Sequence, residues 1–199
     1  MTTQKFLMLF FGGILLLAGI MLFYGRGWQA DPPPPLLSEV PEFTLTERSD
    51  RPFGLDDLRG NIWIADFIFT TCAGPCPIMS QRMSRLQSDF ANAAKVKLVS
   101  FSVDPEQDTP EVLRAYADTY QAQPDKWYFL TGERETIYDL AISGMKISVQ
   151  GATVTSPIIH STYFVLIDAN ARIRGYFNSN EPEALEKLKT DVNMLQREM

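Results

Sequence analysis

Apolar residues form one long block near the amino terminus and a series of shorter blocks after it. Residues 6–24 carry no charge, and about 20 such residues of helix span a bilayer core. The alternative is a cleaved signal peptide. However, the block exceeds the roughly 7–15 residues of a signal core, and the residues after it offer no clean cleavage site. We therefore expect a tail over residues 1–5 and a retained transmembrane anchor over residues 6–25.

A stiff spacer is expected next, over residues 26–39, because four consecutive prolines run from Pro32 to Pro35 and proline-rich linkers adopt extended conformations. Lys5 and Arg26 flank the apolar block, and their placement favours an amino terminus on the cytoplasmic side. This topology predicts a single-pass protein of the inner membrane with its domain in the periplasm, or in the equivalent intermembrane space of a mitochondrion.

Residues 40–199 are expected to form one domain in which strands and helices alternate. The run at 62–69 is almost entirely apolar, with Asp66 as its single charge, and this pattern is typical of a strand buried on both faces. Further strands are predicted near 43–46, 96–103 and 127–130, a hairpin over 162–167 and 173–177, and helices from Pro77, over 108–120, over 133–142 and over 181–196. Residues 53–60 are read as a turn-rich connector, and residues 144–159 as a long excursion without a clear period. The alternation predicts an α/β fold with a mixed central sheet flanked by helices.

Charge narrows the class of partner. Of the 18 basic residues, Lys5 and Arg26 precede Asp31, the first acidic residue, so the rest of the chain has 16 basic against 24 acidic residues. Nucleic-acid binding needs a basic face, and we therefore expect no nucleic-acid partner.

The chemistry concentrates on three side chains. Cys72 and Cys76 are the two cysteines of the chain, and His160 is its one histidine. The cysteines fall where a buried strand passes into a helix, which is the layout of the redox pair in the thioredoxin fold. Positions four apart share a face of a helical turn, so we expect their sulfurs to converge. A helix amino terminus is further expected to lower the pKa of these thiols.

Several functions would use this pair. Two thiolates and one imidazole make a trigonal soft site suited to Cu(I), whereas zinc prefers four ligands and an iron–sulfur cluster needs more cysteines. The leading hypothesis is one copper per monomer, held by Cys72, Cys76 and His160. The second is a thiol–disulfide reductase, with Cys72 at the exposed start of the turn as the attacking sulfur and Cys76 as the resolving one. A redox or copper sensor would use the same residues. A purely structural disulfide is a less favoured hypothesis, because closing so short a loop stabilises a protein little.

The sequence also resembles a known family at three motifs. Phe-Thr-Thr-Cys72-Ala-Gly-Pro-Cys76-Pro is similar to the copper motif of the Sco family, the thioredoxin-like copper chaperones of cytochrome c oxidase assembly. Ser102-Val-Asp104-Pro-Glu-Gln-Asp108-Thr-Pro and His160-Ser-Thr-Tyr-Phe-Val-Leu-Ile-Asp resemble its second and third signatures. The resemblance runs from about Val40 to the last helix.

The resemblance implies that Cys72, Cys76 and His160 bind copper. It also implies that the acceptor is the binuclear copper centre of cytochrome c oxidase subunit II. Another copper acceptor, or other copper chaperones, are alternative partners. One position departs from the pattern: Ile159 stands where an acidic residue often precedes the family's histidine.

Four other residues carry two interpretations each. Either Asp108 or Thr109 is expected to cap a helix, and Asp104 is expected to shape a turn. The alternative interpretation places both carboxylates near the copper site. Met79 and Met83 are expected to be helix core rather than thioether ligands.

Overall fold

The computed structural model describes residues 13, 14, 16–21, 32–147 and 161–199. The chain divides into two compact units, Met1–Pro33 and Pro34–Met199. In the first unit, residues 13, 14 and 16–21 are helical. No helix within the described residues is both long and apolar enough to cross a membrane. The anchor expected over residues 6–25 lies largely outside those residues, so it stays a prediction.

The second unit is built on a mixed eight-stranded sheet with the order β1-β8-β7-β4-β5-β6-β2-β3. The central pairs β4·β5 and β5·β6 are parallel, and the other neighbouring pairs are antiparallel. The strands are β1 (Ser38–Glu39), β2 (Thr44–Glu47), β3 (Pro52–Gly54), β4 (Ile62–Ile68), β5 (Val96–Ser102), β6 (Trp127–Thr131), β7 (Tyr163–Ile167) and β8 (Arg172–Asn178). The prediction of a mixed sheet is confirmed.

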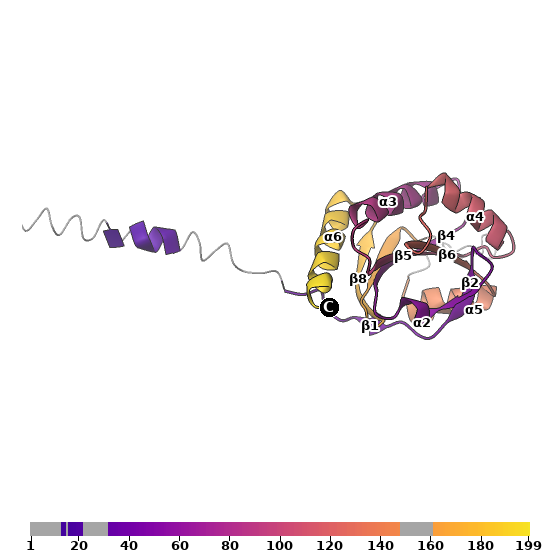
Figure 1. Ribbon diagram of the computed structural model, residues 1–199, viewed down its shortest axis with the longest axis horizontal. Helices are drawn as coiled ribbons and strands as arrows, with labels where there is room; N and C mark the ends of the chain where they lie inside the picture. The colour runs from indigo at the N-terminus through magenta and orange to yellow at the C-terminus, as the bar shows by residue number, and fades with distance from the viewer. Residues whose placement is uncertain (1–12, 15, 22–31, 148–160) are drawn as a thin grey trace, which may run out of the picture. The chain divides into compact units, whose positions relative to one another are not determined.

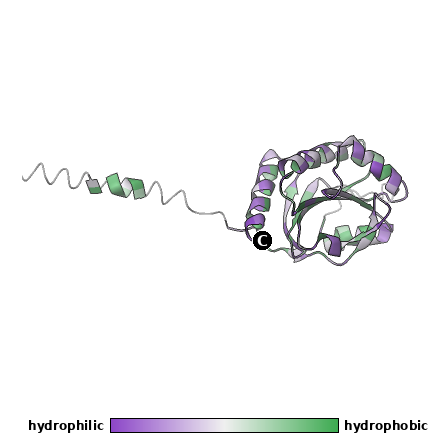
Figure 2. Cartoon of the chain, in the orientation of Figure 1, coloured by the Kyte–Doolittle hydropathy of each residue, from purple (hydrophilic) through white to green (hydrophobic). Residues whose placement is uncertain are grey.

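Helices cover both faces of this sheet. They are α2 (Leu55–Leu58), α3 (Cys76–Asp89), α4 (Pro110–Thr119), α5 (Arg134–Asp139), the π-helical turn η1 (Leu140–Gly144) and α6 (Pro182–Arg197). Helices α3, α4 and α6 lie on one face, and α2 and α5 lie on the other (Figure 1). Figure 2 shows hydrophilic residues along the outer helices, as expected for elements that bury one side only.

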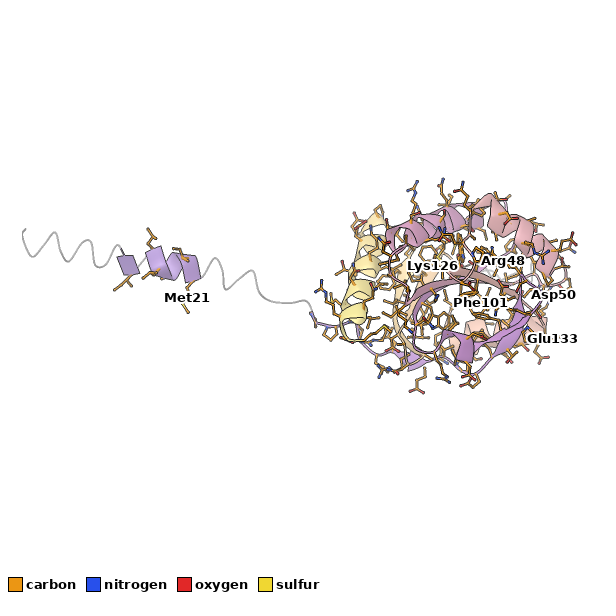
Figure 3. The ribbon with its side chains drawn as sticks, viewed as in Figure 1. Met21, Arg48, Asp50, Phe101, Lys126 and Glu133 are labelled. Atoms are coloured by element: carbon orange, nitrogen blue, oxygen red, sulfur yellow. The ribbon has the colours of Figure 1, made fainter. Side chains whose placement is uncertain are left out.

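The apolar run at residues 62–69 forms the centre of the hydrophobic core. All seven residues of β4 are buried, because a strand with helices above and below has no solvent face. On the neighbouring β5, Phe101 stacks on Phe67 with ring centroids 5.1 Å apart, and Figure 3 shows Phe101 inside the folded unit. The central strands are therefore well packed, and the residues that follow them begin from fixed positions.

Two expectations about connecting segments are wrong. Residues 53–60 are not a simple connector: they contain the end of β3 and helix α2, whose Leu55 and Leu58 are buried. The segment expected as linker also ends earlier, because Arg174 donates hydrogen bonds to the Pro34 and Pro35 carbonyls at 3.0 and 3.3 Å, and β1 pairs with β8. Residues 34–39 therefore belong to the folded unit.

The candidate site lies at the carboxyl edge of the two central strands. β4 and β5 are parallel neighbours, so Ile68 and Ser102, their last residues, lie at the same edge of the sheet. Between β4 and α3 the chain forms a short segment, Thr70–Pro75, which we call the cysteine loop. The connection from β5 to α4 runs beside it and contributes Asp104 and Asp108.

Candidate metal centre

The cysteine loop brings both thiols to one place beneath the surface. Cys72 and Cys76 are free thiols, 7% and 4% exposed. The Cys72 N–H donates to the Phe69 carbonyl at 3.2 Å, which turns the chain after β4. α3 begins at Cys76, with Pro77 in its first turn. Cys72 thus lies outside the helix, and a loop turn, rather than a shared helix face, produces the convergence that the spacing predicts.

Burial controls the chemistry of the second thiol. Desolvation raises the pKa of Cys76, a main-chain hydrogen bond from Phe69 lowers it, and a hydrogen bond with Cys72 raises it further. The expectation of a lowered pKa is therefore wrong for Cys76, because burial outweighs the helix amino terminus. Because Cys72 influences the pKa of Cys76, the two side chains lie close together, as a shared ion or a disulfide requires.

The expected exposure of Cys72 is also wrong, although the residues around it are open to solvent. Thr71, Ala73 and Gly74 are exposed, while Cys72 points inward. A methyl group added at Gly74 would lie 3.8 Å from Cys72 Sγ, in ordinary van der Waals contact. A side chain at position 74 would therefore lie against this sulfur, and glycine leaves that space free.

His160, the third expected ligand, lies outside the described residues. Within the parts of the chain that are described, no group of three His, Cys, Asp or Glu side chains is arranged to hold a metal ion. The described donors are thus two thiol sulfurs side by side. This donor set fits a soft ion, since thiolates select Cu(I) over hard cations, and it leaves room in the set for one ligand from elsewhere.

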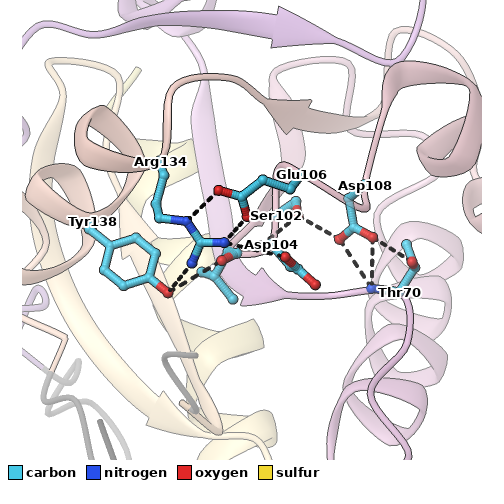
Figure 4. Close-up of polar contacts among 8 residues, drawn as sticks. Thr70, Ser102, Asp104, Glu106, Asp108, Arg134 and Tyr138 are labelled. Carbon is cyan, nitrogen blue, oxygen red and sulfur yellow. Dashed lines mark hydrogen bonds and ion pairs between the residues drawn. The ribbon is translucent and has the colours of Figure 1, made fainter. Parts of the chain in front are cut away.

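The Asp108 carboxylate lies at the cysteine loop, where the alternative interpretation places it. It does not cap α4: that role belongs to Thr109, whose side chain accepts from the Val112 N–H at 3.4 Å. Asp108 is fully buried, and it accepts hydrogen bonds from Thr70 of the cysteine loop and from Ser102 at the end of β5 (Figure 4). Its carboxylate therefore joins the two strand ends at the site.

Asp104 behaves as expected for a turn residue. Its carbonyl accepts from the Gln107 and Asp108 N–H groups at 3.0 and 2.9 Å. Its side chain faces Arg134 of α5 at 3.5 Å, and Arg134 also pairs with Glu106 and lies against Tyr138 (Figure 4). The β5–α4 connection is thus held to the helix on the far face of the sheet.

Asp66 is a buried acid. The sequence shows that it lies within an apolar strand, but not which groups surround its side chain. The side chain is fully buried on β4, and Oδ1 accepts from Ser100 Oγ at 2.6 Å, while Oδ2 has no hydrogen-bond partner. Burial raises the pKa of this carboxyl to about 7. The available signal was a single charge inside an otherwise apolar strand. Such a charge is costly unless it is paired or neutralised.

The two helix methionines are core residues, as expected. Met79 and Met83 are fully buried on α3, and they pack with the side chains of the central sheet in one hydrophobic cluster. Their burial is explained by packing alone, so neither is needed as a ligand.

Comparisons with known proteins agree with this picture. The family model described as SCO1/SenC matches residues 34–194. The "SCO1 protein homolog" of Bacillus subtilis (strain 168) is 34% identical over 160 residues, covering 79% of this chain and 83% of its own. A "putative copper-binding protein" of Stutzerimonas stutzeri is 29% identical over 145 residues, covering 70% and 69% of the two chains.

A solved structure matches the fold. BsSco, described as a member of the Sco family of cytochrome c oxidase assembly proteins with a disulfide switch, superposes with a TM-score of 0.73 at 32% identity. The match covers 83% of this chain and 98% of that one. The expected thioredoxin-like α/β fold is thereby confirmed for the folded unit.

Proposed function

This chain belongs to the SCO1/SenC family, and from that premise we propose that it is a membrane-anchored copper chaperone of cytochrome c oxidase assembly. In this proposal Cys72, Cys76 and His160 hold one copper ion per monomer. The acceptor is the binuclear copper centre of oxidase subunit II. The similarity to a relative described as copper-binding and to a structure described as belonging to oxidase assembly proteins supports this assignment.

The observation that carries the proposal is a pair of free, buried thiols at neighbouring places, Cys72 in the cysteine loop and Cys76 at the start of α3. Cys72 and Cys76, four positions apart, offer two sulfur ligands to one metal ion, and soft sulfur ligands favour Cu(I). The ion must be released as well as bound. If the acceptor replaces the ligands of the copper ion one at a time, copper is never free in solution.

A second function, reduction of the acceptor's disulfide, is favoured by the same pair. Cys72 Sγ attacks one sulfur of the acceptor disulfide and releases the other as a thiolate. Cys76 then attacks the mixed disulfide, leaving Cys72–Cys76 oxidised and the acceptor reduced. The raised pKa of Cys76 suits a resolving thiol that stays protonated until Cys72 has reacted. His160 has no part in this reaction, so it separates the two functions.

The uncharged run at residues 6–24 supports the proposed location. We place the folded unit in the periplasm, or in an equivalent intermembrane space, with residues 6–25 as the anchor. An anchor would hold the unit close to a membrane-bound acceptor and raise the rate at which the two meet.

The experiment that tests the proposal uses cells in which this chain is the one Sco-type protein. The chromosomal copy is changed to His160→Ala, and oxidase activity is measured at limiting copper. We expect oxidase activity to fall to the level of a deletion strain, while the Cys72–Cys76 disulfide is still formed and reduced. Normal oxidase assembly in this strain would replace the chaperone function with the reductase function.

A further inference from the structure

The cysteine loop is tied at its first residue to a carboxylate 38 residues away. The Thr70 N–H donates to Asp108 Oδ2 at 3.1 Å, and Thr70 Oγ1 donates to Asp108 Oδ1 at 2.5 Å (Figure 4). Thr70 lies directly between the end of β4 and Cys72. Both hydrogen-bond donors of this residue are therefore fixed at the point where the chain leaves the sheet.

Asp108 is itself held independently of the cysteine loop. Its Oδ2 accepts from Ser102 Oγ at 2.5 Å, and its own N–H donates to the Asp104 carbonyl at 2.9 Å. Ser102 Oγ in turn accepts from the Asp104 N–H at 3.1 Å. The carboxylate is thus anchored by the end of β5 and the turn that follows it, so it can act as a fixed point for the loop.

A fully buried carboxylate needs hydrogen-bond donors to offset its lost hydration. The Asp108 carboxylate receives them from Thr70 and Ser102, at the ends of the two central strands. Desolvation raises the pKa of Asp108, while the hydrogen bonds from Ser102 and Thr70 lower it. Removing Thr70's donors would leave a buried charge short of partners, which is costly. The loop and the carboxylate therefore stabilise each other, and the helix cap is supplied by Thr109 instead.

We propose that Asp108 is a positioning residue for the dithiol: by holding Thr70 it fixes the cysteine loop so that Cys72 stays within reach of Cys76. The copper part of this inference rests on the proposed function, whereas the thiol part does not. Groups that orient metal ligands typically change metal affinity about 10- to 100-fold when they are removed.

A purely electrostatic role for Asp108 predicts the opposite change in Cu(I) affinity, so the two roles can be distinguished by experiment. If Asp108 acted through its negative charge alone, neutralising it would favour thiolates and tighten Cu(I) binding. If it acts by holding Thr70, neutralising it releases the loop and weakens binding. Thr70→Val adds a test without any change of charge, because it removes the hydroxyl and keeps the main-chain N–H.

The experiment compares four variants of the full-length protein in detergent: Asp108→Asn, Thr70→Val, Thr70→Ser and the matched control Asp104→Asn. Asp104→Asn makes the same charge change in the same connection, but that side chain faces Arg134. Two quantities are measured: Cu(I) affinity by competition with a chromophoric chelator, and the equilibrium constant for closing the Cys72–Cys76 disulfide in mixtures of reduced and oxidised dithiothreitol.

We expect Asp108→Asn to weaken Cu(I) binding about 10- to 100-fold and to lower the disulfide constant. Thr70→Val should move both quantities in the same direction, Thr70→Ser should restore them, and Asp104→Asn should leave them near wild type. Tighter Cu(I) binding in Asp108→Asn, or wild-type values in Thr70→Val, would overturn the inference. If Asp108→Asn does not fold, Thr70→Val decides. If the wild type fails to bind copper while the disulfide constants still shift, the proposed function is lost and the positioning role stands.

Discussion

Ser100 Oγ donates a 2.6 Å hydrogen bond to Asp66 Oδ1 between the two central parallel strands, where both side chains are fully buried. The indole N–H of Trp127 donates to the same hydroxyl at 2.9 Å. Asp66 Oδ2 has no partner. An acid in this position is favoured in its neutral form, because an ionised carboxylate would keep one oxygen desolvated and unpaired.

This arrangement predicts a pH dependence of folding. The pKa of Asp66 is raised from 3.8 to about 7 in the folded state, so the folded chain keeps a proton that the unfolded chain releases near pH 4. Stability is therefore lost as pH rises from about 4 to about 7. Asp66→Asn removes this loss, and the variant should gain roughly 2–4 kcal/mol relative to wild type between pH 5 and pH 8.

Urea unfolding of both proteins at pH 5 and pH 8 measures the difference. Asp56→Asn, which neutralises an exposed carboxyl, controls for the change of charge. Equal stability differences between wild type and Asp66→Asn at the two pH values would show that Asp66 is not a buried neutral acid.

Arg174 predicts a second effect, on the segment that precedes β1. Its guanidinium bonds Asp168 at 2.8 Å and the Pro34 carbonyl, and the side chain is 9% exposed. Arg174→Ala leaves these groups short of a donor in a buried position, and we expect a loss of about 3 kcal/mol in unfolding free energy. Cleavage by proteases near residues 34–39 should become faster.

The matched control is Arg172→Ala. Arg172 pairs with the same Asp168 at 2.9 Å but is 34% exposed, and ion pairs open to solvent contribute little to stability. Equal losses in the two variants, measured by urea unfolding, would contradict the assignment of Pro34 and Pro35 to the folded unit.

The sequence predicted the elements whose pattern is local. The apolar run at 62–69 became β4, and the apolar runs on either side of Asp168 became the β7–β8 hairpin. It also placed Cys72 and Cys76 at the junction of a strand and a helix. These features follow from periodicity, turn residues and proline placement, which are properties of neighbouring residues.

The remainder depends on contacts between distant residues. The Pro34 carbonyl is bound to the folded unit by Arg174, which lies 140 positions later in the chain. Asp108 accepts a hydrogen bond from Thr70 and does not cap the helix that follows it. The raised pKa of Cys76 arises from burial, which no local pattern encodes. The position of the two cysteines is therefore encoded locally, whereas the electrostatics of the site depends on the folded structure.

Membrane topology supplies a third prediction. If residues 6–25 are a retained anchor, the purified mature protein should begin at or near Met1, and protease added to spheroplasts should digest the folded unit. A mature chain beginning near Ala30 would identify a cleaved signal peptide. Protection of the folded unit in intact spheroplasts would place it in the cytoplasm.

A fourth prediction separates metal binding from thiol chemistry. His160→Ala should weaken Cu(I) retention and change any Cu(II) absorption spectrum strongly, because imidazole is the ligand of the three that Cu(II) favours. The rate at which the Cys72–Cys76 disulfide is reduced by dithiothreitol should stay within about twofold of wild type, since exchange depends on thiolate character and access. An unchanged Cu(II) spectrum would remove His160 from the ligand set.

The central claim is that Cys72 and Cys76 together hold one copper ion, and Cu(I) stoichiometry tests it most directly. The full-length reduced protein in detergent is loaded with Cu(I), passed over a desalting column in the presence of a competing chelator, and analysed for copper. We predict one copper per chain in the wild type. Less than about a tenth of that should remain in Cys72→Ser and in Cys76→Ser, because one thiolate is a poor Cu(I) site. Retention of one copper per chain in either serine variant would contradict the claim.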